Sequence, residues 1–168
     1  NQQQSQWEWN VSTVDTSGET GAQLVGAEHC RPSLALDSQG EPHILYCVSP
    51  DLWHAFGSWS GSSWTWDRQI VDEGQNSSNR VGDYPSIVWS SSTGLHIAYH
   101  DGANGSLKYA NSSESGDSTW TWSIETVDAA QGIITGTNTS IAVHDGSVYI
   151  AYHDESNGDL KLAHRTLP

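Results

Sequence analysis

Short runs of apolar and aromatic residues, separated by clusters of Gly, Ser, Asn and Asp, follow one another along the whole chain. The runs are four to nine residues long and rich in Val, Ile, Tyr and Trp, as expected for β-strands bounded by turns. No stretch keeps the apolar period of an amphipathic helix over ten or more residues. The pattern therefore predicts an all-β fold.

A nine-residue segment occurs three times and sets the period of the chain. It reads WEWNVSTVD at residues 7–15, WTWDRQIVD at 64–72 and WTWSIETVD at 120–128, so the first Trp residues lie 57 and 56 residues apart. A fixed period of this length indicates a repeat architecture.

Three further runs follow each copy in the same order. The first is RPSLALD, YPSIVWS or NTSIAVH, the second is HILYC, HIAYHD or YIAYHD, and the third is LWHAF, LKYAN or LKLAH. The loop SQGE and the turns DGANGS and DESNGD are short enough to join neighbouring runs as antiparallel hairpins. Each repeat is therefore predicted to be one antiparallel sheet of four strands.

The two cysteines are placed where such a hairpin would bring them together. Cys30 precedes the first of these runs and Cys47 ends the second. We expect a cross-strand disulfide, the alternative being two buried thiols. A disulfide would indicate an oxidising compartment and hence a secreted protein.

Five Asn-X-Ser/Thr sequons favour the same compartment. They predict N-glycosylation in a host that attaches glycans, whereas Ser-rich turns would also produce such sequons without modification. The acceptor residues are Asn10, Asn76, Asn104, Asn111 and Asn138.

The recurring run IAYHD…NG(D/S)LK(Y/L)A…WTW…VD is similar to β-propeller repeats of the sialidase-like (BNR-like) and lectin-like type, over nearly the whole chain. The resemblance implies three blades, each with its strands ordered from the centre outward and the W-x-W segment outermost. It divides the single repeat domain 1–168 into an N-terminal outer strand (1–15), blade 1 (16–72), blade 2 (73–128) and blade 3 without its own outer strand (129–168).

This offset leaves an unpaired strand at one end and an unpaired edge at the other. Because three blades do not close a ring, we expect the N-terminal strand to complete the last blade of another copy, in a filament or a six-bladed ring of two chains. The alternative is a fragment of a longer propeller, and the absence of Met also suggests a processed or partial chain. The expected joining residues are Trp7, Trp9, Val11 and Val14 on the strand and Leu160, Leu162 and Ala163 on the acceptor edge.

Aromatic and histidine residues are the candidates for chemistry. Both side chains of a W-x-W pair fall on one face of a strand, where we expect them to fill the space between blades. His100 and His153 each precede an Asp, but Cys47 takes this repeat position in the first repeat, so we expect strand residues with capping Asp side chains rather than metal ligands. The candidate sugar-contact residues, which depart from the repeat pattern, are Trp53, Trp59 and Trp89.

No catalytic constellation is recognisable in the chain. The sialidase motif S-x-D-x-G-x-x-W is absent, and the four Arg residues that could grip a carboxylate lie at non-equivalent repeat positions. A net charge of −14 argues against nucleic acid and anionic membranes as partners, and no run of eighteen apolar residues occurs.

We therefore expect a non-enzymatic secreted structural protein that assembles with itself and needs no cofactor or metal. The alternative is a carbohydrate-binding, lectin-like propeller with glycans as partners. A hydrolase fragment is a third hypothesis.

Overall fold

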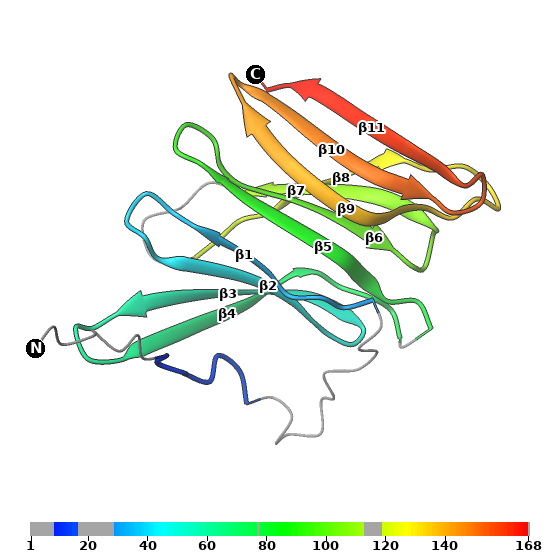
Figure 1. Ribbon diagram of the computed structural model, residues 1–168. Coiled ribbons are helices and arrows are strands. Elements are labelled where there is room, and N and C mark those ends of the chain that lie inside the picture. The colour runs from blue at the N-terminus through cyan, green and yellow to red at the C-terminus, as the bar shows by residue number, and fades with distance from the viewer. Residues whose placement is uncertain (1–8, 17–28, 77, 113–118, 168) are drawn as a thin grey trace, which may run out of the picture.

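The computed structural model describes residues 9–16, 29–76, 78–112 and 119–167. In these ranges the chain forms eleven strands and no helix (Figure 1), which confirms the predicted all-β class. Accordingly, no helix in these ranges is long and apolar enough to cross a membrane.

The strands form three antiparallel sheets in chain order, with strand orders β1-β2-β3-β4, β5-β6-β7-β8 and β9-β10-β11. The first sheet consists of β1 (Ser33–Leu36), β2 (Pro42–Val48), β3 (Asp51–Trp59) and β4 (Trp64–Asp72). The second consists of β5 (Val81–Ser90), β6 (Gly94–Asp101), β7 (Ser106–Ser112) and β8 (Ser123–Asp128). The third consists of β9 (Thr135–His144), β10 (Ser147–Asp154) and β11 (Asp159–Thr166).

The sheets are stacked so that their first strands, β1, β5 and β9, lie side by side (Figure 1). The same hydrogen bond joins each neighbouring pair of first strands. The backbone N–H of Ile87 donates to Ser33 Oγ at 3.2 Å, and the N–H of Ile141 donates to Ser86 Oγ, also at 3.2 Å. The repeat in sequence is therefore a repeat in the contacts between sheets.

Two apolar clusters fill the spaces between the sheets. Leu45 and Leu52 of the first sheet meet Ile87, Ile97 and Tyr99 of the second. On the opposite face of the second sheet, a cluster that includes Ala98, Leu107 and Tyr109 meets Ile141, Val148, Ile150 and Tyr152 of the third. Each inner sheet face is apolar because side chains alternate between the two faces of a strand.

The predicted disulfide and strand order are confirmed. Cys30 and Cys47 are bonded, with their Cα atoms 5.8 Å apart. Within each sheet the W-x-W segment, where it is part of a strand, lies at the far edge from the first strand, as the repeat indicates. The turns containing Asn-Gly close hairpins as predicted, with four residues between β6 and β7.

The described part of the first copy, residues 9–16, is not paired as a strand within this chain, and its pairing with another copy stays a prediction. They lie beside the first sheet, near β4, without joining it as a fifth strand (Figure 1). Trp7 lies outside the described residues. In the third copy only the second half pairs fully, since β8 begins at Ser123.

Candidate functional site

A hydrogen bond between Tyr and Asp recurs where one repeat meets the next. The hydroxyl of Tyr99 donates to Asp72 Oδ2 at 2.8 Å, and that of Tyr152 donates to Asp128 Oδ2 at 2.7 Å. Each Asp ends a W-x-W segment, and each Tyr belongs to the second strand of the following sheet. The last strand of one sheet is thus tied to the middle of its neighbour.

Asp15 makes the same contact with the first sheet, although no sheet precedes it in the described residues. Tyr46 donates to Asp15 Oδ2 at 2.7 Å. Val14 beside it packs against Tyr46 and Val48, as Val71 packs into the cluster between the first and second sheets. Residues 14 and 15 therefore hold the place that the outer strand of a preceding sheet would occupy.

A cation completes each Tyr–Asp pair. Lys108 Nζ lies 2.8 Å from Asp72 and 3.3 Å from Asp101. Lys161 Nζ lies 3.1 Å from Asp128 and 2.8 Å from Asp154. In the first repeat Trp53 stands at this position, and Arg68 of β4 supplies the cation by pairing with Asp15.

These contacts shift the pKa values of their members. Burial raises the pKa of Tyr152 to about 12, and the bond to Asp128 adds to the rise. Burial opposes ionisation of Asp101, but hydrogen bonds from Asn104 and the charge of Lys108 outweigh it and lower the pKa of that carboxyl. The bond from Lys161 lowers the pKa of Asp154 to about 2. The lowered pKa values keep Asp101 and Asp154 in the charged form at neutral pH.

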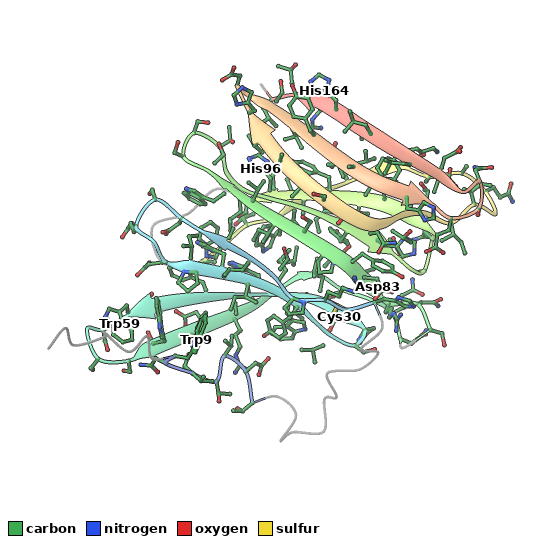
Figure 2. The ribbon with its side chains drawn as sticks, viewed as in Figure 1. Trp9, Cys30, Trp59, Asp83, His96 and His164 are labelled. Atoms are coloured by element: carbon green, nitrogen blue, oxygen red, sulfur yellow. A yellow bond between two sulfur atoms is a disulfide. The ribbon has the colours of Figure 1, made fainter. Side chains whose placement is uncertain are left out.

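The side chains of Trp9 and Val11, earlier in the described part of this segment, are 95% and 90% exposed. Its buried contacts with the first sheet are those of Val14 and Asp15. Figure 2 shows Trp9 beside the first sheet, at the opposite end of the stack from His164 on β11.

The outer face and edge of the third sheet expose apolar side chains that are buried in the other repeats. Leu160 on β11 is 83% exposed, whereas Leu52 and Leu107 at the same repeat position are fully buried. Leu162 is 66% exposed, whereas its equivalents His54 and Tyr109 are 1% and 2% exposed. In the first two sheets the following sheet covers these positions.

The outer face of the first sheet also exposes apolar side chains whose equivalents in the following sheets are buried. Leu34 is 60% exposed, while Ile87 and Ile141 at the same repeat position are 7% and 8% exposed. Leu36 on the same strand is also exposed. The two ends of the stack therefore carry the two halves of the contact that the repeats make with one another inside the chain.

The W-x-W segment before β8 also takes part in the contact between the first two sheets. Trp120 is buried against the first sheet, with its ring centroid 5.1 Å from that of His43 and 5.6 Å from that of His54. The Gln69 side chain fixes it by donating Nε2–H to the Trp120 carbonyl at 2.7 Å and accepting the Trp120 N–H at 3.1 Å. Trp120 and Trp122 therefore fill the space between the first two sheets, as expected, whereas Trp66 packs on the outer face of the first sheet with Tyr46 and Val48.

The structure does not bring the three candidate sugar-contact residues into one site. Trp89 is half-buried and stacks on His43, and Trp53 packs beside Tyr46 in the cluster on the first sheet's outer face. Trp59 is 46% exposed and, with Trp64, borders a shallow hollow whose polar members are Asn10, Gln39 and Glu41.

The His–Asp pairs have structural roles in the described contacts. His100 Nδ1 lies 2.8 Å from the Thr135 carbonyl oxygen of the third sheet. Asp101 accepts the backbone N–H groups of Ala103 and Asn104, which confirms the predicted turn cap. Within the described ranges no three His, Cys, Asp or Glu side chains are grouped as metal ligands would be.

Four of the five sequon asparagines are exposed and therefore sterically open to a glycan: Asn10, Asn76, Asn104 and Asn138. Asn111 on β7 is half-buried. Whether glycans are attached stays a prediction.

Sequence reasoning missed two sets of contacts, the Tyr–Asp links and the grip of Gln69 on Trp120. A signal for the first was present, because Tyr46, Tyr99 and Tyr152 recur at one repeat position and an Asp ends every W-x-W segment.

Comparison of the sequence with models of protein families and with curated protein sequences gives no match.

Proposed function

We propose that this protein is a secreted, non-enzymatic structural protein whose copies join head to tail by strand complementation. The three sheets act as propeller-type blades, and residues 9–15 of one copy add to β11 of another as its missing outer strand. The observation that carries the proposal is the exposure of Leu160 and Leu162 at positions where the other repeats are buried. The disulfide supports an extracellular location.

The internal repeat supplies the argument for a second copy as the occupant. The surfaces that meet between the first and second sheets, and again between the second and third, are the same two surfaces left exposed at the ends of the stack. A contact between different surfaces of identical chains is heterologous and propagates until it closes. In this arrangement Ser140 Oγ would accept the N–H of Leu34 from the next copy, continuing the series of Ser33 and Ser86.

Charge also favours this pairing. The strand segment WEWNVSTVD carries two acids and no cation. The acceptor strand β11 carries Lys161 and Arg165, two of only six Lys and Arg residues in a chain of net charge −14. β11 carries these two cations and one acid, Asp159, so its own charges favour an acidic strand over a basic one.

The test is the mass and shape of the assembled particle, by light scattering and negative-stain imaging. Uniform fibres, or a discrete particle of two chains, are expected for the unaltered protein. Deleting residues 1–15 removes the joining strand, and Leu160→Asp with Leu162→Asp places charges under the following sheet, so both changes should yield monomers. Ser91→Asp, in the exposed turn after β5, is the matched control and should assemble normally.

The proposal would be overturned if the unaltered protein stayed monomeric at high concentration. So would assembly that survives both the deletion and the double aspartate variant. If further repeats covered β11 within one longer chain, that longer chain would be monomeric, which also contradicts head-to-tail joining.

A second candidate function, glycan binding, is favoured by the hollow beside Trp59 and Trp64. Two aromatic rings next to Asn10, Gln39 and Glu41 combine the stacking faces and polar groups that a sugar needs. A glycan array tests it, with Trp59→Ala expected to abolish binding and Trp53→Ala, outside the hollow, expected to retain it. Binding that Trp59→Ala leaves unchanged would exclude this site.

A further inference from the structure

A groove of about 330 Å³ runs between the second and third sheets, along β8 and β11. Its floor is apolar, with Val148 and Ile150 of the third sheet beside Tyr109 of the second. Its rim is charged, because Glu125 of β8 faces Arg165 of β11 at 2.5 Å. The hydroxyl of Tyr109 lies 2.6 Å from Nδ1 of the buried His96, which fixes the ring at the floor.

The corresponding place between the first and second sheets is filled by tryptophan. Trp120 and Trp122, in the W-x-W segment just before β8, stand edge-on to the His54 ring at 5.6 and 5.3 Å between centroids. Tyr109 takes the repeat position of His54, and Glu125 takes that of Gln69, the residue that grips the Trp120 backbone. The groove thus has the residues that correspond to His54 and Gln69, which hold Trp120 and Trp122 in the first interface, but no W-x-W pair occupies it among the described residues.

Arg165 covers the groove in this structure. Its guanidinium carbon lies 5.2 Å from the centroid of the Tyr109 ring, in the manner of a cation–π contact. Arg165 is half-exposed, and its partner Glu125 is exposed to a similar degree, so this pair is a weak, solvent-screened cover.

We propose that this groove is a docking site for an acidic aromatic strand, and that its occupant is the W-x-W pair of a second copy, Trp7 and Trp9. The inference rests on the proposed function and adds the residues that recognise the strand. One indole lies against Tyr109, as Trp120 lies against His54. Glu125 accepts a backbone N–H of the incoming strand, as Gln69 accepts the N–H of Trp120. Arg165 turns away from Glu125 and pairs with the carboxylate of Glu8, which lies between the two indoles.

The groove fits this occupant better than a small molecule in two respects. The equivalent Gln69 hydrogen-bonds the backbone of a W-x-W segment and not a ring substituent. Among the strands that the structure describes, β11 pairs with β10 alone, so its other edge offers backbone hydrogen bonds to an incoming peptide.

A dye-labelled synthetic peptide with the sequence of residues 1–15, added to the full-length protein, tests the inference by fluorescence anisotropy. We expect saturable binding that shortens the assemblies, because the peptide occupies the groove that the next copy needs. The peptide with Trp7→Ala and Trp9→Ala should bind at least tenfold more weakly. In the protein, Glu125→Gln should retain binding, since Gln performs this role at position 69, and Arg165→Glu should weaken it severalfold. Arg31→Glu, an exposed arginine outside the groove, is the charge-matched control.

The outcomes separate this inference from the proposed function. Equal binding of the two peptides, or no binding by a protein that does assemble, overturns the groove while leaving head-to-tail assembly in place. Tryptophan-dependent binding to a protein that never assembles supports the groove and overturns the proposed function. Loss of binding in Arg31→Glu equal to that in Arg165→Glu reduces the effect to net charge and contradicts a specific site.

Discussion

A Cβ atom placed on Gly82 would lie 2.6 Å from Cβ of Leu52, in the neighbouring sheet. The same contact recurs one repeat later, where a Cβ on Gly136 would lie 2.5 Å from Cα of Leu107. Both glycines have positive φ, +93° and +84°. Close approach of consecutive sheets at these two points therefore depends on the absence of a side chain.

Gly82→Ala should consequently destabilise the protein more than the same substitution at a glycine that has a similar positive φ but no neighbouring atoms around its Cβ position. Gly40 has φ +80° and nothing within 4 Å of its Cβ position, so Gly40→Ala should cost only the left-handed backbone, about 1–2 kcal/mol. Gly82→Ala adds overpacking of about 1–3 kcal/mol. Chemical denaturation at one protein concentration measures both, and equal losses would show that the sheets separate without cost.

Reducing the disulfide should lower stability without abolishing the fold. Cys30 and Cys47 are separated by 17 residues, and closing a loop of that length stabilises by about 3 kcal/mol in the chain-entropy account. We expect the double variant Cys30→Ser, Cys47→Ser to melt roughly 5–12 °C lower, with no further effect of reductant. A melting temperature that reductant leaves unchanged in the unaltered protein would contradict a disulfide in solution.

Buried histidines should make the protein less stable in mild acid. Burial lowers the pKa of His43 to about 4, of His54 to about 3 and of His96 to about 4, while the unfolded chain has values near 6.5. Above pH 6.5 neither state takes up protons at these groups. As the pH falls from 6.5 to about 4, the unfolded chain binds protons that the folded chain excludes, so the free energy of unfolding declines.

The slope is at most about 1.4 kcal/mol per pH unit for each histidine. Urea denaturation between pH 7.5 and 4, at one protein concentration, measures it. His54→Gln should reduce the slope, whereas His144→Gln, on a side chain 79% exposed, should leave it unchanged. A flat profile between pH 6.5 and 4.5 would mean that these rings are accessible to water.

The Tyr–Asp links should differ in what they stabilise. Tyr99→Phe removes a buried donor to Asp72 within the body of the protein, at a cost of about 1.5–3 kcal/mol for a bond to a charged group. Tyr46→Phe removes the equivalent donor to Asp15, which anchors only residues 9–15. We expect little change in global unfolding for Tyr46→Phe, but faster amide exchange in residues 9–15. Equal effects on global stability would show that this segment belongs to the folding core.

The register of the proposed strand exchange follows from the two complete sheets. Ala55 pairs with Arg68 and Ala110 with Ile124, so by the repeat Ala163 should face Val11 of another copy. Mixing a Val11→Cys chain with an Ala163→Cys chain should therefore give a covalent dimer under mild oxidation, seen on a non-reducing gel. Ser12→Cys with Ala163→Cys is the control, because a shift of one residue turns the side chain to the other face. Equal yields from the two mixtures would contradict the register.

Much of the fold was predictable because it depends on local sequence patterns. The alternation of apolar runs and turn residues predicted the strands, and the spacing of Trp64 and Trp120 predicted the repeat. The resemblance to propeller repeats implied the order of strands within each sheet. The Cys30–Cys47 bond followed from a hairpin with a short loop. These features depend on residues near one another in sequence, where pleat and turn chemistry leave few choices.

The candidate site was only partly predictable. Leu160 and Leu162 were expected at an acceptor edge, and their exposure agrees with that position, but the groove under Arg165 was not expected. Its members come from β7, β8, β10 and β11, and nothing in the local sequence of Arg165 indicates that it covers Tyr109.

The sequence by itself determined the repeat, the all-β class and the disulfide, because strand alternation and turn chemistry act over a few residues. Only the tertiary structure decided which face of each sheet meets which, that Asp15 is held by Tyr46, and that residues 9–16 lie on the first sheet without pairing as a strand. Those outcomes depend on side chains 30 to 55 residues apart meeting across a sheet interface, as in the separations of 31 for Tyr46–Asp15 and 54 for Ile87–Ser33. Contacts of that range form only when the sheets stack, because their free energy comes from burying both faces together.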